Sequence, residues 1–320
     1  MVKRISRIDA LLLLMTVIWG TNYAIVKHAF REMDPQAFNA VRMVIASTVF
    51  LSIIVGLRRF GIAETAAPAD DSVASIFHSP APITRADWLG LAGLGIVGHC
   101  FYQFLFISGL SQTSVANSAL MLAATPVVIA LVSAALGQDR VSPLHWAGAA
   151  LSLTGISIVV GHGAELGSSS LRGDVMMFGA VFCWAVFTIG ARPLMKRHSP
   201  VGVTGVSMTI GTMAYLTALT PHLLRVSWSG ISAGTWMVLV YSALFALCVS
   251  YTIWYAAVRE IGSARTSVYS NLVPIVALLT AVVFVGEPLG ATKAIGAAAV
   301  LVGVALTRVG RPKVPIPAEE

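Results

Sequence analysis

The chain has 320 residues, of which 57% are hydrophobic and only 11% are charged. Soluble domains carry about 25% charged residues, so this composition excludes an ordinary soluble protein. The basic residues behind the net charge of +7 lie between apolar runs and form no stripe, which argues against a nucleic-acid partner. Charge-free runs of about 20 residues recur along the whole chain and indicate membrane-spanning helices.

Ten membrane-spanning helices are predicted. The first is an uncleaved helix rather than a signal peptide, because its apolar run continues from Leu11 to Val26. Pro35 and Pro200 stand where helices begin, a position that tolerates the missing amide proton. The predicted spans cover residues 9–28, 35–56, 87–108, 113–136, 142–161, 173–192, 200–220, 235–258, 264–286 and 290–308.

The second half of the chain repeats the first. Residues 110–158 fall without a gap on residues 258–306 at an offset of 148, and nearer the N-terminus the offset is 165. The offset changes because the loop over 57–86 is longer in the first half. The paired positions are Trp19 with Trp184, Lys27 with Arg192, Pro126 with Pro274, Asp139 with Glu287, Gly148 with Gly296, and Gly155 with Gly303.

This repeat predicts an all-α polytopic membrane protein of two five-helix units, residues 9–161 and 173–308, with a disordered tail over 309–320. An odd number of spans per unit places the second unit upside down. With the N-terminus in the cytoplasm, 15 of the 21 Lys and Arg residues fall on the cytoplasmic side and 5 on the other. We therefore expect a multi-pass protein of the inner (cell) membrane with both termini cytoplasmic.

Inverted repeats are typical of transporters, whose substrate site lies near the bilayer midplane between the halves. A set of motifs is distributed over the two halves: Trp19-Gly20-Thr21-Asn22, Arg42, Pro126 with Asp139-Arg140, Asn271-x-x-Pro274, Val285-Gly286-Glu287-Pro288, Gly296 and Gly303. In these motifs the chain resembles the drug/metabolite transporter superfamily, and in particular its EamA-type ten-helix branch. The first half departs from the family at Gly137-Gln138-Asp139, where Gly-Glu is more usual. The resemblance implies export or exchange of small metabolites, often amino acids, through a cavity lined by spans 1, 3, 4, 6, 8 and 9.

Polar and aromatic side chains in the middle of these spans predict the cavity lining, because polar groups are costly in lipid and usually face the bundle interior. Such a lining suits an amphipathic solute. The alternative is that the aromatic residues only pack helices together. The predicted substrate-binding residues are Trp19, Asn22, Tyr23, His99, Tyr102, Gln103, Met121, Trp184, Thr188, Tyr251, Tyr255 and Asn271.

His99, Tyr102, Gln103 and Phe106 recur at helical spacing and are predicted to share one helix face. A histidine side chain has an unperturbed pKa near neutral, so His99 is expected either to bind a substrate carboxylate or pass on a proton, or to be a neutral histidine satisfied by a neighbouring helix. Arg42 either snorkels to the interface or holds a carboxylate at the cavity mouth, where it would act as a gate.

Three further pairs of equivalent residues, and the paired glycines, are predicted to move or to shape the bundle. Pro126 and Pro274 lie in mid-span and act either as hinges or as fixed kinks. Lys27 and Arg192 are either gate charges or interfacial anchors. Asp139 and Glu287 are interpreted as acids that complement the dipole of the following helix. The paired glycines are expected to let helices approach closely.

No carboxylate lies in mid-span, which disfavours a proton-coupled mechanism like that of the four-helix multidrug exporters in the same superfamily. The chain carries no catalytic or metal-binding motif, so we expect neither an enzyme nor a cofactor. The favoured function is amino-acid efflux by alternating access. The alternatives are a sugar, nucleoside or drug exchanger of the same superfamily and a non-transporting membrane receptor. A monomer or a homodimer is expected.

Overall fold

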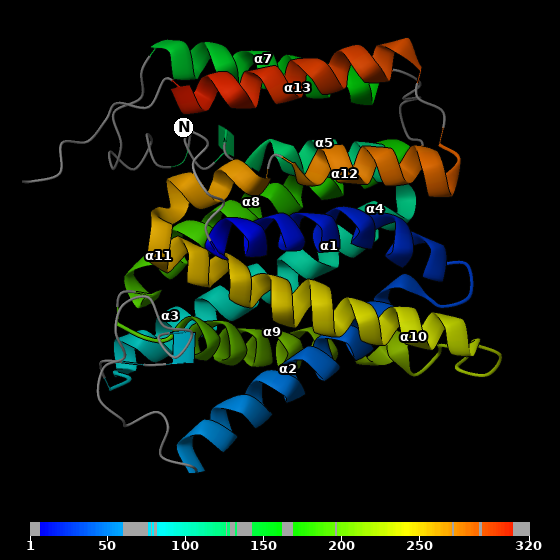
Figure 1. Cartoon of the computed structure of the whole chain (residues 1–320). Coiled ribbons are helices and arrows are strands. Elements are labelled where there is room, and N and C mark those ends of the chain that lie inside the picture. Colours follow the sequence, from blue (N-terminus) through cyan, green and yellow to red (C-terminus); the bar gives the residue numbers. More distant parts are fainter. Residues whose placement is uncertain are drawn as a thin grey trace, which may run out of the picture.

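The computed structural model describes residues 7–59, 76–77, 79, 82–125, 127–128, 132, 143–161, 169–195, 197–270, 272–287 and 290–309. Within these ranges every regular element is helical (Figure 1). The helices of the first half are α1 (Arg7–Ala29), α2 (Pro35–Arg59), α3 (Arg85–Leu94), η2 (Gly95–Phe101), α4 (Tyr102–Gln112), α5 (Val115–Ala123) and α7 (Pro143–Gly161). Those of the second half are α8 (Ser169–Met195), α9 (Pro200–Leu223), α10 (Ala233–Tyr241), η3 (Ser242–Val249), α11 (Ser250–Ser270), α12 (Val273–Thr280), η4 (Ala281–Val285) and α13 (Ala291–Val309).

The helices confirm a polytopic α-helical membrane protein. Six segments of the described residues are long and apolar enough to cross a membrane by themselves. Helices α5, α7, α12 and α13 occupy the remaining four predicted positions. The six long segments are Arg7–Ala29, Pro35–Leu57, Arg85–Gln112, Leu171–Met195, Pro200–Leu223 and Ala233–Ala257.

Helices of one half pack mainly against helices of the other. Helix α1 packs against α11 and α12, and its counterpart α8 packs against α4 and α5. Two further pairs join counterparts directly: α2 with α9, and α7 with α13, which lie side by side at one edge of the bundle (Figure 1). This exchange of equivalent contacts is the arrangement that two pseudo-symmetric units produce.

Equivalent residues touch where the two units meet. The hydroxyls of Ser47 and Thr212, which are 165 positions apart, lie 2.8 Å from each other. A Cβ atom on Gly303 would lie 2.6 Å from the carbonyl oxygen of Gly148, and one on Gly155 would lie 2.7 Å from that of Gly296. The small-residue face predicted for the last helix of each unit is therefore what lets α7 and α13 approach this closely.

One predicted helix boundary is wrong. The connection expected between residues 258 and 264 lies inside α11, and the break comes instead between Ser270 and Val273. In the first half the equivalent break is made by Ser114, whose side chain accepts a hydrogen bond from the backbone of Asn117 and caps α5. The position equivalent to Ser114 is Gly262, which has no side chain to make that cap.

Glu287 ties the two units together at one end of the bundle. Its carboxylate accepts hydrogen bonds from the backbone nitrogens of Val115 at 2.8 Å and Ala116 at 3.2 Å. The interpretation that Glu287 complements the following helix is wrong, because the dipole it meets is that of α5 in the other unit. Its counterpart Asp139 lies outside the described residues.

Lys27 belongs to the same end of the bundle. Its ammonium donates to the carbonyl of Thr113, and the hydroxyl of Thr113 donates to Asp174 at 2.6 Å. These contacts join α1, the turn before α5, and α8, all on the face opposite the predicted cytoplasmic side. Lys27 is therefore a link between helices, which is compatible with its prediction as a gate charge.

Candidate functional site

A pocket opens at the centre of the bundle, between the two units. Its walls come from the helices of predicted spans 1, 3, 4, 6, 8 and 9, together with Arg42 of α2. Eight of the twelve predicted substrate-binding residues line it: Trp19, Asn22, Tyr23, Tyr102, Gln103, Trp184, Thr188 and Tyr251. Other lining residues, outside that predicted set, include Phe106, Thr125, Leu247, Trp254, Ser270 and Val273.

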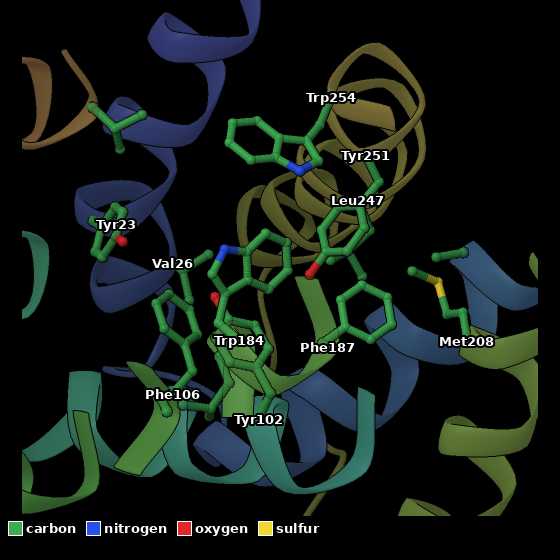
Figure 2. Close-up of a cluster of buried hydrophobic side chains, with 14 of the residues drawn as sticks. Tyr23, Val26, Tyr102, Phe106, Trp184, Phe187, Met208, Leu247, Tyr251 and Trp254 are labelled. Atoms are coloured by element: carbon green, nitrogen blue, oxygen red, sulfur yellow. The ribbon is translucent and has the colours of Figure 1, made fainter. Parts of the chain in front are cut away.

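Aromatic rings from both units form the wall around Trp19. Its ring centroid lies 6.2 Å from that of Trp184, 5.9 Å from Tyr251 and 5.8 Å from Trp254. The first two contacts are edge to face, the geometry that the ring quadrupoles favour. Figure 2 shows Tyr102 of α4, Trp184 of α8, and Tyr251 and Trp254 of α11 converging on one space. Flat apolar faces thus dominate the pocket.

A π-helical segment precedes the pocket residues in both units. Segment η2 leads into Tyr102 and Gln103, and η3 occupies the corresponding place before Tyr251. Such segments are rare and frequently lie at functional sites. Phe106 follows Tyr102 by one turn of regular α-helix, and both side chains reach the pocket as their spacing predicts.

His99 does not line the pocket. Its side chain is fully buried, with its ring 5.0 Å from that of Phe187 and 5.8 Å from that of Tyr251. The prediction that His99 shares a face with Tyr102 assumed α-helical periodicity. His99 lies within η2, where hydrogen bonds run from i to i+5, so the wider turn changes the direction of its side chain relative to the following helix.

Four other predicted positions lie away from the lining or outside the description. Met121 is buried in the core on a different side of α5 from the lining residue Leu122. Tyr255 is buried one turn beyond Tyr251 and packs against Phe187, 5.9 Å between ring centroids. Asn271 and Pro126 fall outside the described residues.

Arg42 faces the pocket rather than the membrane interface. Only 1% of its surface is exposed, so the snorkelling alternative is wrong. One terminal nitrogen, Nη2, donates to the side-chain oxygens of Asn39 and Gln103, both at 2.7 Å. The other, Nη1, donates to the hydroxyl of Ser242 at 3.1 Å. Three helical segments, α2, α4 and η3, thereby hold the guanidinium in place.

Ser242 extends this network to the pocket wall on α1. Having accepted from Arg42, its hydroxyl donates to the side-chain oxygen of Asn22 at 2.7 Å. The sequence analysis missed Ser242 and Asn39. A serine within an apolar span carries no distinguishing local signal, and only the approach of η3 to α2 shows its role.

Pro274 lines the pocket, but it does not kink a continuous helix. It stands in the first turn of α12, where the missing amide proton breaks no hydrogen bond. Helix α11 ends at Ser270 and helix α12 begins at Val273, and both of these residues line the same cavity. Pro274 therefore starts the second segment of a discontinuous span, and its role as a hinge stays a prediction.

Comparison with known proteins places this architecture. The model of the EamA-like transporter family matches residues 6–161 and again residues 171–309, one match for each unit. The chain belongs to the EamA-like transporter family. It is thus a multi-pass membrane transporter whose two repeats each carry one copy of the family's module.

Two relatives of this transporter match it over almost their whole length. It is 26% identical to the uncharacterized transporter YyaM of Bacillus subtilis, over 95% of this chain and 94% of that protein. It is 25% identical to a probable amino-acid metabolite efflux pump of Salmonella typhimurium, over 93% of this chain and 94% of that protein. A solved crystal structure with 20% identity aligns with a TM-score of 0.61 over 97% of this chain and 100% of the other, which supports the fold.

Aromatic and neutral polar side chains make up most of the polar and ring-bearing lining of this transporter pocket. No acid is among its lining residues, and no group of three metal-ligating side chains occurs within the described part of the chain. What the pocket offers is aromatic surface, a few neutral polar groups and one guanidinium. That combination favours a small amphipathic solute.

Proposed function

We propose that this transporter exports amino acids or closely related amphipathic metabolites by alternating access. The observation that carries the proposal is the position of the pocket. It lies between the units, and its wall is built from equivalent residues of both, Trp19 and Trp184. A site shared in this way can be exposed to one side and then the other as the units exchange conformations.

Two further observations support the proposal. The pocket combines aromatic walls with polar groups that include Arg42, Gln103 and Asn22, which matches the mixed character of an amino acid. The similarity to a probable amino-acid metabolite efflux pump is of low identity but covers both units. The proposed orientation has both termini in the cytoplasm, following the excess of Lys and Arg in the predicted cytoplasmic segments.

Counterflow in proteoliposomes tests the proposal. Vesicles containing the purified transporter are loaded with unlabelled amino acid, and transient accumulation of the labelled amino acid is measured over a panel that includes aromatic and aliphatic members. Accumulation that protein-free vesicles lack supports the proposal. Counterflow of sugars or nucleosides alone would instead identify an exchanger of those solutes, and binding without any counterflow would identify a receptor.

A further inference from the structure

Within the part of the chain that the structure describes, Arg42 is a buried cation without an anionic partner. Its hydrogen-bond acceptors are the neutral groups of Asn39, Gln103 and Ser242. Among the described residues, the ion pairs involve only Asp87 and Asp34, and neither pairs with Arg42. A guanidinium keeps its charge in proteins, and a buried charge left uncompensated is strongly unfavourable. The positive charge of Arg42 therefore lacks a compensating negative charge in this site.

Two residues of the pocket lining also carry a buried hydrogen-bond donor that has no acceptor. The Nε of Arg42 and the indole nitrogen of Trp254 are buried donors with no partner, and neither group can accept. Both residues line the same pocket. Arginine has five N–H groups and three of these make the contacts above, which leaves the Nε–H and one Nη1–H. The Nε–H and the free Nη1–H lie on different edges of the planar guanidinium, so either of them can donate to a carboxylate oxygen.

Among the described lining residues, the pocket offers a positively charged group no partner comparable to the one that Arg42 offers a carboxylate. No Asp or Glu is among the described residues that line the pocket, and the oxygens of Gln103 and Asn22 already accept from the Arg42 network. The hydroxyls of Thr125 and Thr188 donate to carbonyls of their own helices. An ammonium would meet only neutral oxygens and aromatic faces, which attract a cation weakly compared with a carboxylate.

We propose that Arg42 binds the carboxylate of the transported solute, and that this group, rather than an ammonium, is what the pocket requires. The solute class is a monocarboxylate with an aromatic or apolar body, which includes amino acids and acids that lack the amino group. This inference rests on the proposed function, which it narrows to one anchoring residue and one recognised group. A doubly charged phosphate fits less well, because Arg42 is the only basic residue among the described residues that line the pocket.

Three small probes that share one ring test the inference on the wild-type protein. They are L-phenylalanine, 3-phenylpropionate, which lacks the ammonium, and 2-phenylethylamine, which lacks the carboxylate. Binding is measured as ligand-dependent thermal stabilisation of the purified transporter in detergent. Both carboxylates should raise the unfolding temperature, and the amine should need at least about tenfold higher concentration for the same effect. Equal stabilisation by the amine, or none by either carboxylate, would overturn the inference.

Variants then assign the effect to Arg42. Arg42→Gln should abolish the preference for carboxylates over the amine, and Arg42→Lys should keep the preference with weaker binding. The matched control is Ser47→Ala on the same helix, which loses a buried hydrogen bond to Thr212 outside the pocket and should keep the preference. If Arg42→Gln still prefers carboxylates as strongly as the wild type, Arg42 is not the anchor. If it does not fold, the preference of Arg42→Lys and the wild-type series decide.

The two proposals fail in different ways. Stabilisation by 3-phenylpropionate without counterflow of any amino acid leaves the carboxylate site intact and contradicts amino-acid export. Counterflow of L-phenylalanine that 2-phenylethylamine inhibits as well as 3-phenylpropionate does leaves amino-acid export intact and contradicts the carboxylate site.

Discussion

Trp19 and Trp184 occupy the same position in the two units, and their rings meet edge to face with centroids 6.2 Å apart. Both residues line the central pocket. The proposed solute site is therefore lined by residues that the pseudo-symmetry of the two units relates to each other. Movement of one unit against the other must change the surroundings of both tryptophans, which gives the repeat a direct connection to transport.

Replacing Trp184 by alanine should weaken binding of the transported solute. Trp184 contributes a face to the pocket and contacts Tyr102, with 5.2 Å between ring centroids. We expect the apparent KM for the solute to rise about tenfold, which corresponds to ~1.4 kcal/mol of binding. Trp236→Ala is the matched control, because that indole is exposed on α10 and does not line the pocket. An unchanged KM in Trp184→Ala would contradict the placement of the site.

Gly303→Ala should destabilise the pair α7 and α13. The added Cβ would lie 2.5 Å from the backbone nitrogen of Ser152 and 2.6 Å from the carbonyl of Gly148, so the helices must separate. Overpacking of this kind costs about 1–3 kcal/mol. The measurement is thermal unfolding in detergent. Gly93→Ala is the control, since its Cβ would meet nothing within 4 Å. Equal unfolding temperatures for the two variants would contradict the close approach.

Glu287→Ala should loosen the end of the bundle at which it binds α5. The substitution removes both acceptors of the Val115 and Ala116 backbone nitrogens and the charge that complements the helix dipole. Charge–dipole contacts are worth about 0.3–2 kcal/mol. We expect a lower unfolding temperature, with Glu287→Gln intermediate because its amide oxygen still accepts. Glu260→Ala, at an exposed position on α11, should change little. A Glu287→Ala variant as stable as Glu260→Ala would show that the contact contributes nothing.

His99→Leu should leave substrate affinity unchanged. The imidazole is fully buried outside the lining, and neither of its nitrogens has a hydrogen-bond partner. Replacing an unpartnered polar side chain by an apolar one of similar size is nearly neutral or stabilising. We expect KM within about twofold of the wild type and an unfolding temperature that does not fall. A raised KM with a normal unfolding temperature would return His99 to the solute path.

Periodicity and self-similarity were sufficient to predict the helical membrane fold and much of the site. A bilayer admits only a few backbone arrangements, so long apolar runs specify helices without reference to their neighbours. The pairing of Trp19 with Trp184 came from the repeat alone. Aromatic and polar residues at these positions then followed from the cost of placing polar groups in lipid, and eight of twelve predicted residues line the pocket.

The predictions that were wrong share one physical cause, which is that they depend on tertiary neighbours. His99 was misplaced because a π-helical turn, which depends on how η2 packs against α9, changes side-chain directions. The predicted partner of Glu287 was wrong because a carboxylate in a connecting turn can meet any helix end that tertiary structure brings to it. Local pattern carries no information about such neighbours.

Composition, repeat and hydropathy determined that this chain is a two-unit transporter of the membrane, because those features are properties of the chain taken segment by segment. Tertiary structure alone decided that Arg42 faces inward, held by Asn39, Gln103 and Ser242 without an acid beside it. The charged group of an arginine near the start of a span can lie either at the lipid interface or in the interior of the bundle. The interior position becomes possible because Gln103 and Ser242, which are 61 and 200 positions away along the chain, supply hydrogen-bond acceptors there.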